Sequence, residues 1–120
     1  MSMRLDRLAE KLGLSVVEGR RAHQLRVDRA YAGDRISDIL NQASDTTLIV
    51  TNLANSSVVR VIELMDVPGV CLLNGIQPDA ELVEAAREHG AALLVSPEDM
   101  YRTCGRVYQL LESERAAQAV

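Results

Sequence analysis

Polar side chains follow each of three apolar runs in the second half of this chain. They begin with the last residue of TTLIVT, GVCLLN and AALLVS. They comprise Thr51, Asn52, Asn55, Ser56 and Ser57; Asn74 and Gln77, with Gly75 between them; and Ser96. Where such residues begin a helix, unpaired backbone N–H groups and a partial positive charge favour an anion. The pattern therefore fits a docking point for a nucleotide or an acidic metabolite. Asn and Ser are also ordinary helix N-caps, so capping alone is the simpler competing interpretation.

A second group of candidates precedes a short helical pattern in GDRISD. Asp34 and Asp38 are four residues apart, a spacing that places two carboxylates on one helical face, where they can hold Mg²⁺. Arg35 between them is a candidate partner for a phosphate or carboxylate, because a guanidinium can donate paired hydrogen bonds. The alternative is structural: Asp38 or Ser37 favours the first turn of the helix, and Asp34 pairs with a nearby arginine.

Other catalytic chemistries lack their residues. Lys11 is the single lysine and no GxxxxGK[ST] motif is present, so a P-loop phosphotransferase is excluded. His23 and His89 have no ligands at metal-binding spacing, and neither Cys71 nor Cys104 has a recognisable base. We expect no metal site of this kind, no cofactor, and two reduced cysteines of a cytoplasmic protein.

Apolar periodicity predicts the elements that position these residues. A first helix places Leu5, Leu8 and Leu12 on one face and ends at Gly13. LSVVEG then predicts a short strand. HQLRVDRAYAGD predicts one half-exposed edge strand, because apolar and polar residues alternate there. A short helix follows from Ile36.

The three apolar runs each lead into an amphipathic helical pattern. Because the runs are continuously apolar, both faces of the strands must be covered, and the repeated alternation predicts a mainly parallel sheet. Ser96, Pro97 and Asp99 predict the start of the last helix, with Ser96 as its N-cap, and Gly90 predicts the end of the helix before it. We expect one α/β domain over residues 1–113 and a flexible tail over 114–120.

Composition narrows the class of partner. The 120 residues contain no Phe or Trp, which predicts an aliphatic core and argues against base stacking on single-stranded nucleic acid. Residues 1–35 carry eight basic and five acidic residues, and residues 36–120 carry five and twelve. This asymmetry fits either scattered solvated charge or two faces that meet in a self-complementary dimer. No DNA or RNA partner is expected, and no membrane contact, because no apolar stretch is long enough to span a bilayer.

The order of these elements resembles the DRTGG domain family. The resemblance covers about residues 25–112 and rests on YAGDRISDIL followed by TLIVTNLANSSVVRVIELMDVPGVCLLNGIQPDAELVEAAREHGAALLVSPEDMYRTCGRVYQLL. The stretch that names the family corresponds to Asp34–Asp38, where only its first two letters are kept. The resemblance implies a three-layer α/β fold similar to the N-terminal, non-catalytic domain of HPr kinase/phosphorylase. It also implies a regulatory or dimer-forming role.

The sequence therefore supports three possible functions. The first is a non-catalytic regulatory or interaction module that forms a homodimer or binds a partner protein, through an exposed apolar strip on the last helix or through the edge strand. The second is a sensor that binds a nucleotide or acidic metabolite, with a site of eight residues: Asp34, Arg35, Thr51, Asn52, Asn55, Ser56, Asn74 and Gly75. The third is an enzyme with Asp34 and Asp38 on a metal ion.

Overall fold

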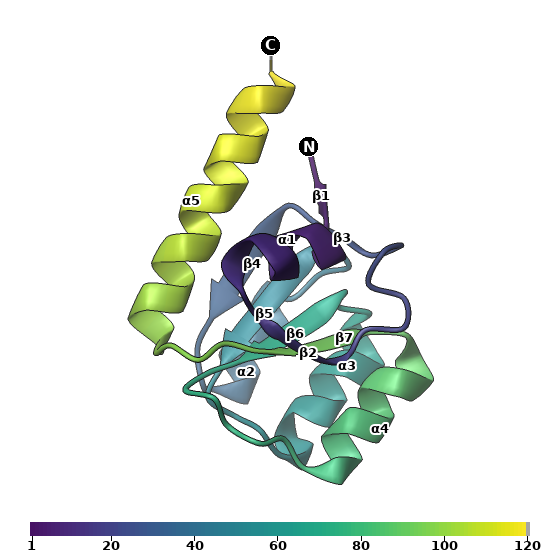
Figure 1. Ribbon diagram of the computed structural model, residues 1–120. Helices are drawn as coiled ribbons and strands as arrows, with labels where there is room; N and C mark the ends of the chain where they lie inside the picture. Colours follow the sequence, from purple (N-terminus) through teal and green to yellow (C-terminus); the bar gives the residue numbers. More distant parts are fainter. Residues whose placement is uncertain (120) are drawn as a thin grey trace.

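A five-stranded sheet lies between two layers of helices in the computed structural model, which describes residues 1–119 (Figure 1). The strands, in the order in which they lie across the sheet, are β2 (Ser15–Glu18), β7 (Ala92–Val95), β6 (Gly69–Leu72), β5 (Thr47–Thr51) and β4 (Arg29–Ala32). A separate two-stranded sheet pairs β1 (Met3–Arg4) with β3 (Arg26–Val27). The helices are α1 (Leu5–Leu12), α2 (Ile36–Gln42), the short 3₁₀ helix η1 (Ser56–Val58), α3 (Val59–Met65), α4 (Ala80–His89) and α5 (Met100–Gln118).

The four strands from β4 to β7 run parallel, and β2 alone is antiparallel to its neighbour β7. Leu48 lies beside Gly69, and Val70 lies beside Leu93, so the three apolar runs share one sheet and one direction. Every residue of β5, β6 and β7 is buried. The predicted α/β class and mainly parallel sheet are confirmed.

Alternate residues of the central strands face opposite layers. Leu48 and Val50 of β5 pack in one apolar cluster with residues of α1 and α5, whereas Ile49 packs in a second cluster with residues of α2, α3 and α4. Full burial of a Leu or Ile side chain contributes about 1.5–3 kcal/mol, so the two clusters supply the main force that holds the layers together. The three-layer arrangement is confirmed.

Glycines end two of the helices as predicted. Gly13 after α1 has φ 65°, and Gly90 after α4 has φ 69°. Both are in the left-handed region, where glycine carries no steric penalty, and the backbone N–H of each donates back to the last turn of its helix.

The predicted single edge strand over residues 23–34 is wrong in part. It divides at Asp28, whose backbone N–H donates to the carbonyl of Thr46 at 3.1 Å. The part before Asp28 is β3, which pairs with β1 and buries Val27 completely. The part after it is β4, which lies at the edge of the main sheet as expected.

The last helix differs from the prediction at both ends. Asp99, and not Ser96, is the N-cap of α5, because its Oδ1 accepts from the backbone N–H of Arg102 at 2.9 Å. Residues 114–118, predicted as part of a flexible tail, continue α5 as helix, and residue 120 lies outside the described residues. The helix returns the chain to its start, where Nε2 of Gln118 donates to the carbonyl of Ser2 at 3.2 Å (Figure 1). The boundary of the single domain stays a prediction.

Candidate functional site

The ends of β5 and β6 bring several of the predicted site residues together. Asp34 precedes α2 and is not on the helix, and its carboxylate accepts three hydrogen bonds from the end of β5. The Thr51 hydroxyl donates to Oδ1 at 2.9 Å, the Asn52 backbone N–H donates to Oδ1 at 2.7 Å, and the Asn52 amide donates to Oδ2 at 2.9 Å. Asp34 therefore fastens the loop before α2 to the sheet.

The charge of Asp34 is stabilised by these donors. Partial burial raises the pKa of its carboxyl group, but the hydrogen bonds from the side chain and backbone of Asn52 and from Thr51 outweigh burial. The pKa of Asp34 consequently lies below its usual value, and the carboxylate is ionised at neutral pH.

Asn52 extends the network to the neighbouring strand. Its Oδ1 accepts from the Asn74 amide at 3.3 Å. Asn74 and Gly75 follow β6 with φ 58° and 62°, two successive left-handed residues that turn the chain sharply. Their backbone N–H groups donate to the carbonyls of Glu98 and Ser96 at 2.9 and 2.8 Å. This loop is thereby fixed to the end of β7.

The remaining predicted residues have local structural roles. Asn55 accepts from the Ser57 backbone N–H at 3.0 Å and from the Ser57 hydroxyl, so it caps η1, with Ser56 as the first residue of that turn. Arg35 is exposed at the N-cap position of α2. Ser96 is fully buried and shares a hydrogen bond of 2.7 Å with the Thr103 hydroxyl of α5. Capping is thus the observed role of Asn55.

The arrangement gives the metal alternative no support. Asp34 and Asp38 do not share a helix, and the Asp34 oxygens are occupied by Thr51 and Asn52. Residues 1–119 contain no group of three or more His, Cys, Asp or Glu side chains placed to hold a metal ion. Asp38 lies in the first turn of α2, where a negative charge favours the helix.

The cysteines are poorly suited to nucleophilic chemistry. Burial raises the pKa of the Cys71 thiol to about 12, and burial also raises the pKa of Cys104. Both are free thiols, and the thiolate is the reactive form. At neutral pH both side chains remain protonated.

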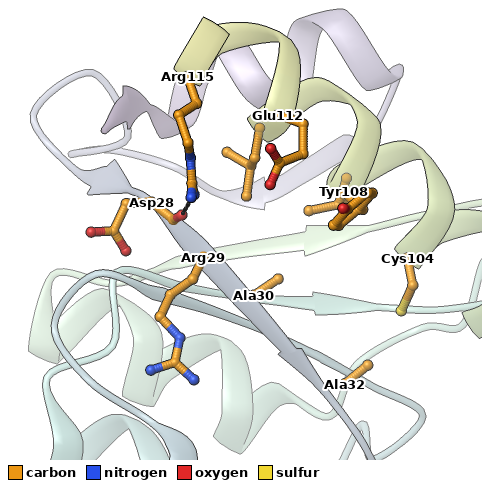
Figure 2. Close-up of a pocket in the computed structure, with 10 residues that line it drawn as sticks. Asp28, Arg29, Ala30, Ala32, Cys104, Tyr108, Glu112 and Arg115 are labelled. Carbon is orange, nitrogen blue, oxygen red and sulfur yellow. Dashed lines mark hydrogen bonds between the residues drawn. The ribbon is translucent and has the colours of Figure 1, made fainter. Parts of the chain in front are cut away.

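A groove that sequence reasoning missed lies between β4 and α5 (Figure 2). Its volume is about 370 Å³, and it is lined by Asp28, Arg29, Ala30, Ala32, Cys104, Val107, Tyr108, Leu111, Glu112 and Arg115. The alanines of β4 are short, so they leave space beneath the larger side chains of α5. The outer edge of β4 has no strand partner among the described residues.

Charged groups of both signs close one end of this groove. Arg115 of α5 donates to the backbone carbonyl of Asp28 at 3.4 Å, and Glu112 lies on the same helix beside Arg115 (Figure 2). The side chain of Arg29 points away from α5, and its guanidinium donates to Oε1 of Gln42 in α2 at 3.3 Å. Tyr108 forms one wall although 69 % of its surface is exposed. On the same helix Tyr101 is 86 % exposed. We call the groove together with these two tyrosines the β4–α5 surface.

The signal for this surface was present in the sequence only in part. Tyr101 and Tyr108 lie seven residues apart, a helical spacing that marks one face of the last helix. The β4 wall of the groove comes from residues near position 30, and nothing in the local pattern shows that β4 lies beneath α5.

No protein-family model matches this chain, and no curated protein matches it. Among solved structures, a crystal structure of the CBS and DRTGG domains of the regulatory region of Clostridium perfringens pyrophosphatase, complexed with the activator diadenosine tetraphosphate, is similar. The TM-score is 0.64 at 15 % sequence identity, over 86 % of this chain. The chain has the fold of a DRTGG-like domain. It spans 44 % of the length of that neighbour.

The DRTGG-like fold accounts for the element order that the sequence suggested from about residue 25 onward. In the segment before that point, residues of β1 and α1 pack in the same apolar cluster as residues of β5, β6 and β7. No helix among residues 1–119 combines the length and the apolar character that crossing a membrane requires.

Proposed function

We propose that this DRTGG-like domain is a non-catalytic regulatory module of the cytoplasm that works as a homodimer. The observation that carries the proposal is the β4–α5 surface, where Tyr108, 69 % exposed, lines an apolar groove of about 370 Å³. Tyr101, two helical turns away on the same face of α5, is 86 % exposed. Large exposed aromatic side chains beside an apolar recess are typical of protein–protein contacts.

Two further observations support a regulatory role. The similar solved structure is a regulatory region, and its fold is shared by this chain. Within residues 1–119, the polar groups at the strand ends bond to one another, and both thiols have a raised pKa. These groups have structural roles, and the exposed β4–α5 surface is the candidate for recognition in this proposal.

The experiment is a direct measurement of mass in solution. Sedimentation equilibrium or light scattering at tens of micromolar, a concentration that detects contacts of micromolar affinity, should give twice the chain mass of 13.1 kDa. A single-chain mass across this range contradicts the proposal.

A second candidate is a sensor for a nucleotide or an acidic metabolite at the strand ends. The neighbour's complex with diadenosine tetraphosphate favours it, and exposed Arg35 next to Asp34 is the available cation there. Asn52, Asn55 and Ser56 are the exposed polar side chains that follow β5.

Thermal unfolding with diadenosine tetraphosphate, ATP and acetyl phosphate tests this candidate. A ligand at about a hundred times its Kd adds about 2.7 kcal/mol to the free energy of unfolding, and Arg35→Ala should remove that gain. Exposed Arg7 of α1 is the control position, for Arg7→Ala, because Leu5 of the same helix lies against Gly69 at the opposite end of β6. Unchanged unfolding curves with all three compounds would remove the candidate.

A further inference from the structure

The outward face of α5 carries one continuous line of exposed residues. Tyr101, Gly105, Tyr108 and Glu112 succeed one another at spacings of four, three and four residues, which keeps them within about 60° of one another around the helix. All four are exposed, while Val107 and Leu111 on the inner face are buried against the sheet. The outer line therefore has no partner within residues 1–119.

Gly105 is the unexpected member of this line. It lies inside a 19-residue helix, a position where glycine is among the least favourable residues. A Cβ at Gly105 would meet no atom within 4 Å, so no close contact within the described chain requires a glycine there. An exposed glycine in a helix lets another molecule approach its backbone closely.

The neighbours of Gly105 show what could fill the space above it. One helical turn away on each side stand Tyr101 and Tyr108, both largely exposed. An aromatic ring packs well on a bare helix backbone, and this chain supplies such a ring three residues from the glycine. A contact between Gly105 and Tyr108 of another molecule buries the exposed ring and fills the open space above the glycine.

The charges on α5 favour a second copy in the antiparallel direction. The first half of the helix carries Arg102 and Arg106 and no acidic residue, and the second half carries Glu112, Glu114 and Arg115, so the two halves have net charges of +2 and −1. When two copies of α5 run in opposite directions, the basic half of each lies beside the acidic half of the other. A parallel pair would place like charges together.

We propose that two α5 helices pack antiparallel about a two-fold axis midway between Gly105 and Tyr108. Tyr108 of each copy then lies on the partner's Gly105, and Tyr101 faces the partner's Glu112, where its hydroxyl donates to the carboxylate. This inference rests on the proposed function and specifies the partner and the geometry of its contact. A two-fold axis forms each contact twice, and two-fold symmetry is the commonest symmetry of homodimers.

The exposed tyrosines of α5 supply much of the area that such a contact needs. A tyrosine buries about 150–250 Å² when it is fully covered, so the four tyrosines of two copies supply about 600–1,000 Å². A stable specific interface buries about 1,200–2,000 Å². The exposed side chains of Arg102, Gln109 and Glu112 flank the tyrosines on α5 and add to this area in both copies.

The decisive variant is Gly105→Met. Because the position is open, the substitution leaves the fold of one chain intact, and it fills the space that Tyr108 of the second copy requires. We expect Gly105→Met to weaken the dimer at least about tenfold, with an unchanged far-ultraviolet circular dichroism spectrum. Tyr108→Ala should weaken it by a similar factor, since central tyrosines are typical hot spots. The matched control is Ser113→Met. Ser113 is exposed on α5 but lies outside the proposed contact, about 80° from Gly105 and about 140° from Tyr108 around the helix axis.

The double variant Gly105→Met/Tyr108→Ala tests the contact itself. Moving bulk from position 108 to position 105 restores a large side chain opposite a small one, so the double variant should dimerise more tightly than either single variant. Sedimentation measures all four dissociation constants.

The outcomes separate this geometry from the proposed function. A dimeric parent chain whose dissociation constant changes equally little in Gly105→Met, Tyr108→Ala and Ser113→Met overturns the antiparallel α5 contact and leaves the homodimer standing. A parent chain that is monomeric overturns both. Weakening by Gly105→Met and Tyr108→Ala, with recovery in the double variant, supports both.

Discussion

The carboxylate of Asp34 lies 2.7 Å from the backbone nitrogen of Asn52, although the two residues belong to different crossovers of the sheet. Two further bonds, from the Thr51 hydroxyl and the Asn52 amide, make Asp34 the acceptor at the end of β5. The residue that sequence reasoning assigned to ligand binding therefore has a structural task, which can be measured.

Replacing Asp34 by Asn should destabilise the fold. The substitution keeps the side-chain size but turns one acceptor into a donor and removes the charge, so at least one N–H or O–H of Thr51 and Asn52 loses its partner. We expect a loss of about 1–3 kcal/mol in the free energy of unfolding, measured by urea denaturation. Asp45→Asn, in an exposed loop, is the control and should stay within about 0.5 kcal/mol of the parent. Equal stabilities for the two variants would show that the network contributes nothing.

Glu18 should make stability fall in acid. The backbone N–H of Arg20 donates to its carboxylate at 3.0 Å, and Arg87 lies at 3.4 Å. The bond from Arg20 is the largest cause that lowers the pKa of Glu18, burial opposes it, and Arg87 adds to the lowering. The unfolded chain therefore binds this proton at higher pH than the folded chain does.

The contribution of Glu18 to the free energy of unfolding is therefore complete above its ordinary pKa of 4.5. It is lost as the pH falls through the lower pKa that Glu18 has in the folded chain. Urea denaturation from pH 7 to pH 3 should show a smaller decline for Glu18→Gln than for the parent chain. Glu88→Gln, at an exposed position of α4, is the matched control for the removal of one carboxyl group. Parallel curves for Glu18→Gln and the parent would contradict the cause assigned here.

Two glycine-to-alanine substitutions should act in opposite directions. A Cβ at Gly69 in β6 would lie 2.8 Å from Leu5 Cδ2 and 3.2 Å from the Ala92 carbonyl oxygen, and backbone in a central strand yields little. We expect Gly69→Ala to cost about 1–3 kcal/mol. Gly105→Ala meets nothing and should add up to about 1 kcal/mol through helix propensity. Both are measured in the Tyr108→Ala background, so that any contribution from self-association is reduced equally.

Thiol reactivity should report both burial and assembly. Ellman's reagent at pH 8 should leave Cys71 unmodified in the folded protein, because its pKa is about 12 and its side chain is fully buried. Cys104 should react slowly, and it should react faster in Tyr108→Ala because it lines the groove next to that residue. The variants Cys104→Ala and Cys71→Ala separate the two signals, and urea should make each remaining thiol react at once. Rapid labelling of Cys71 without urea would contradict the packing of β6.

The strands and helices that bury continuous apolar surface were predictable from sequence. Leu48, Val70 and Leu93 lie in mainly apolar runs without a regular polar alternation, a pattern typical of strands that are covered on both faces. The division at Asp28 was not predictable, because β3 pairs with β1 from the start of the chain while β4 pairs with β5. Apolar and polar residues alternate in the same way in β3 and in β4, so the alternation does not indicate that the two strands belong to different sheets.

The candidate site shows the same limit. Thr51, Asn52 and Asn74 could be assigned to one edge of the sheet because they follow parallel strands. That their polar groups bond to Asp34 and to one another depends on side-chain directions, which residue types do not determine. The choice of Asp99 over Ser96 as the cap of α5 is similar: both residues are good caps, and burial of Ser96 against Thr103 decides between them.

The hydrogen bond between Gln118 and Ser2 places the two extremities of the described chain next to each other. This contact links the last turn of α5 to the segment before β1. Fraying of either segment removes a hydrogen bond from the other, so the backbone amides of both should lose protection from hydrogen exchange together.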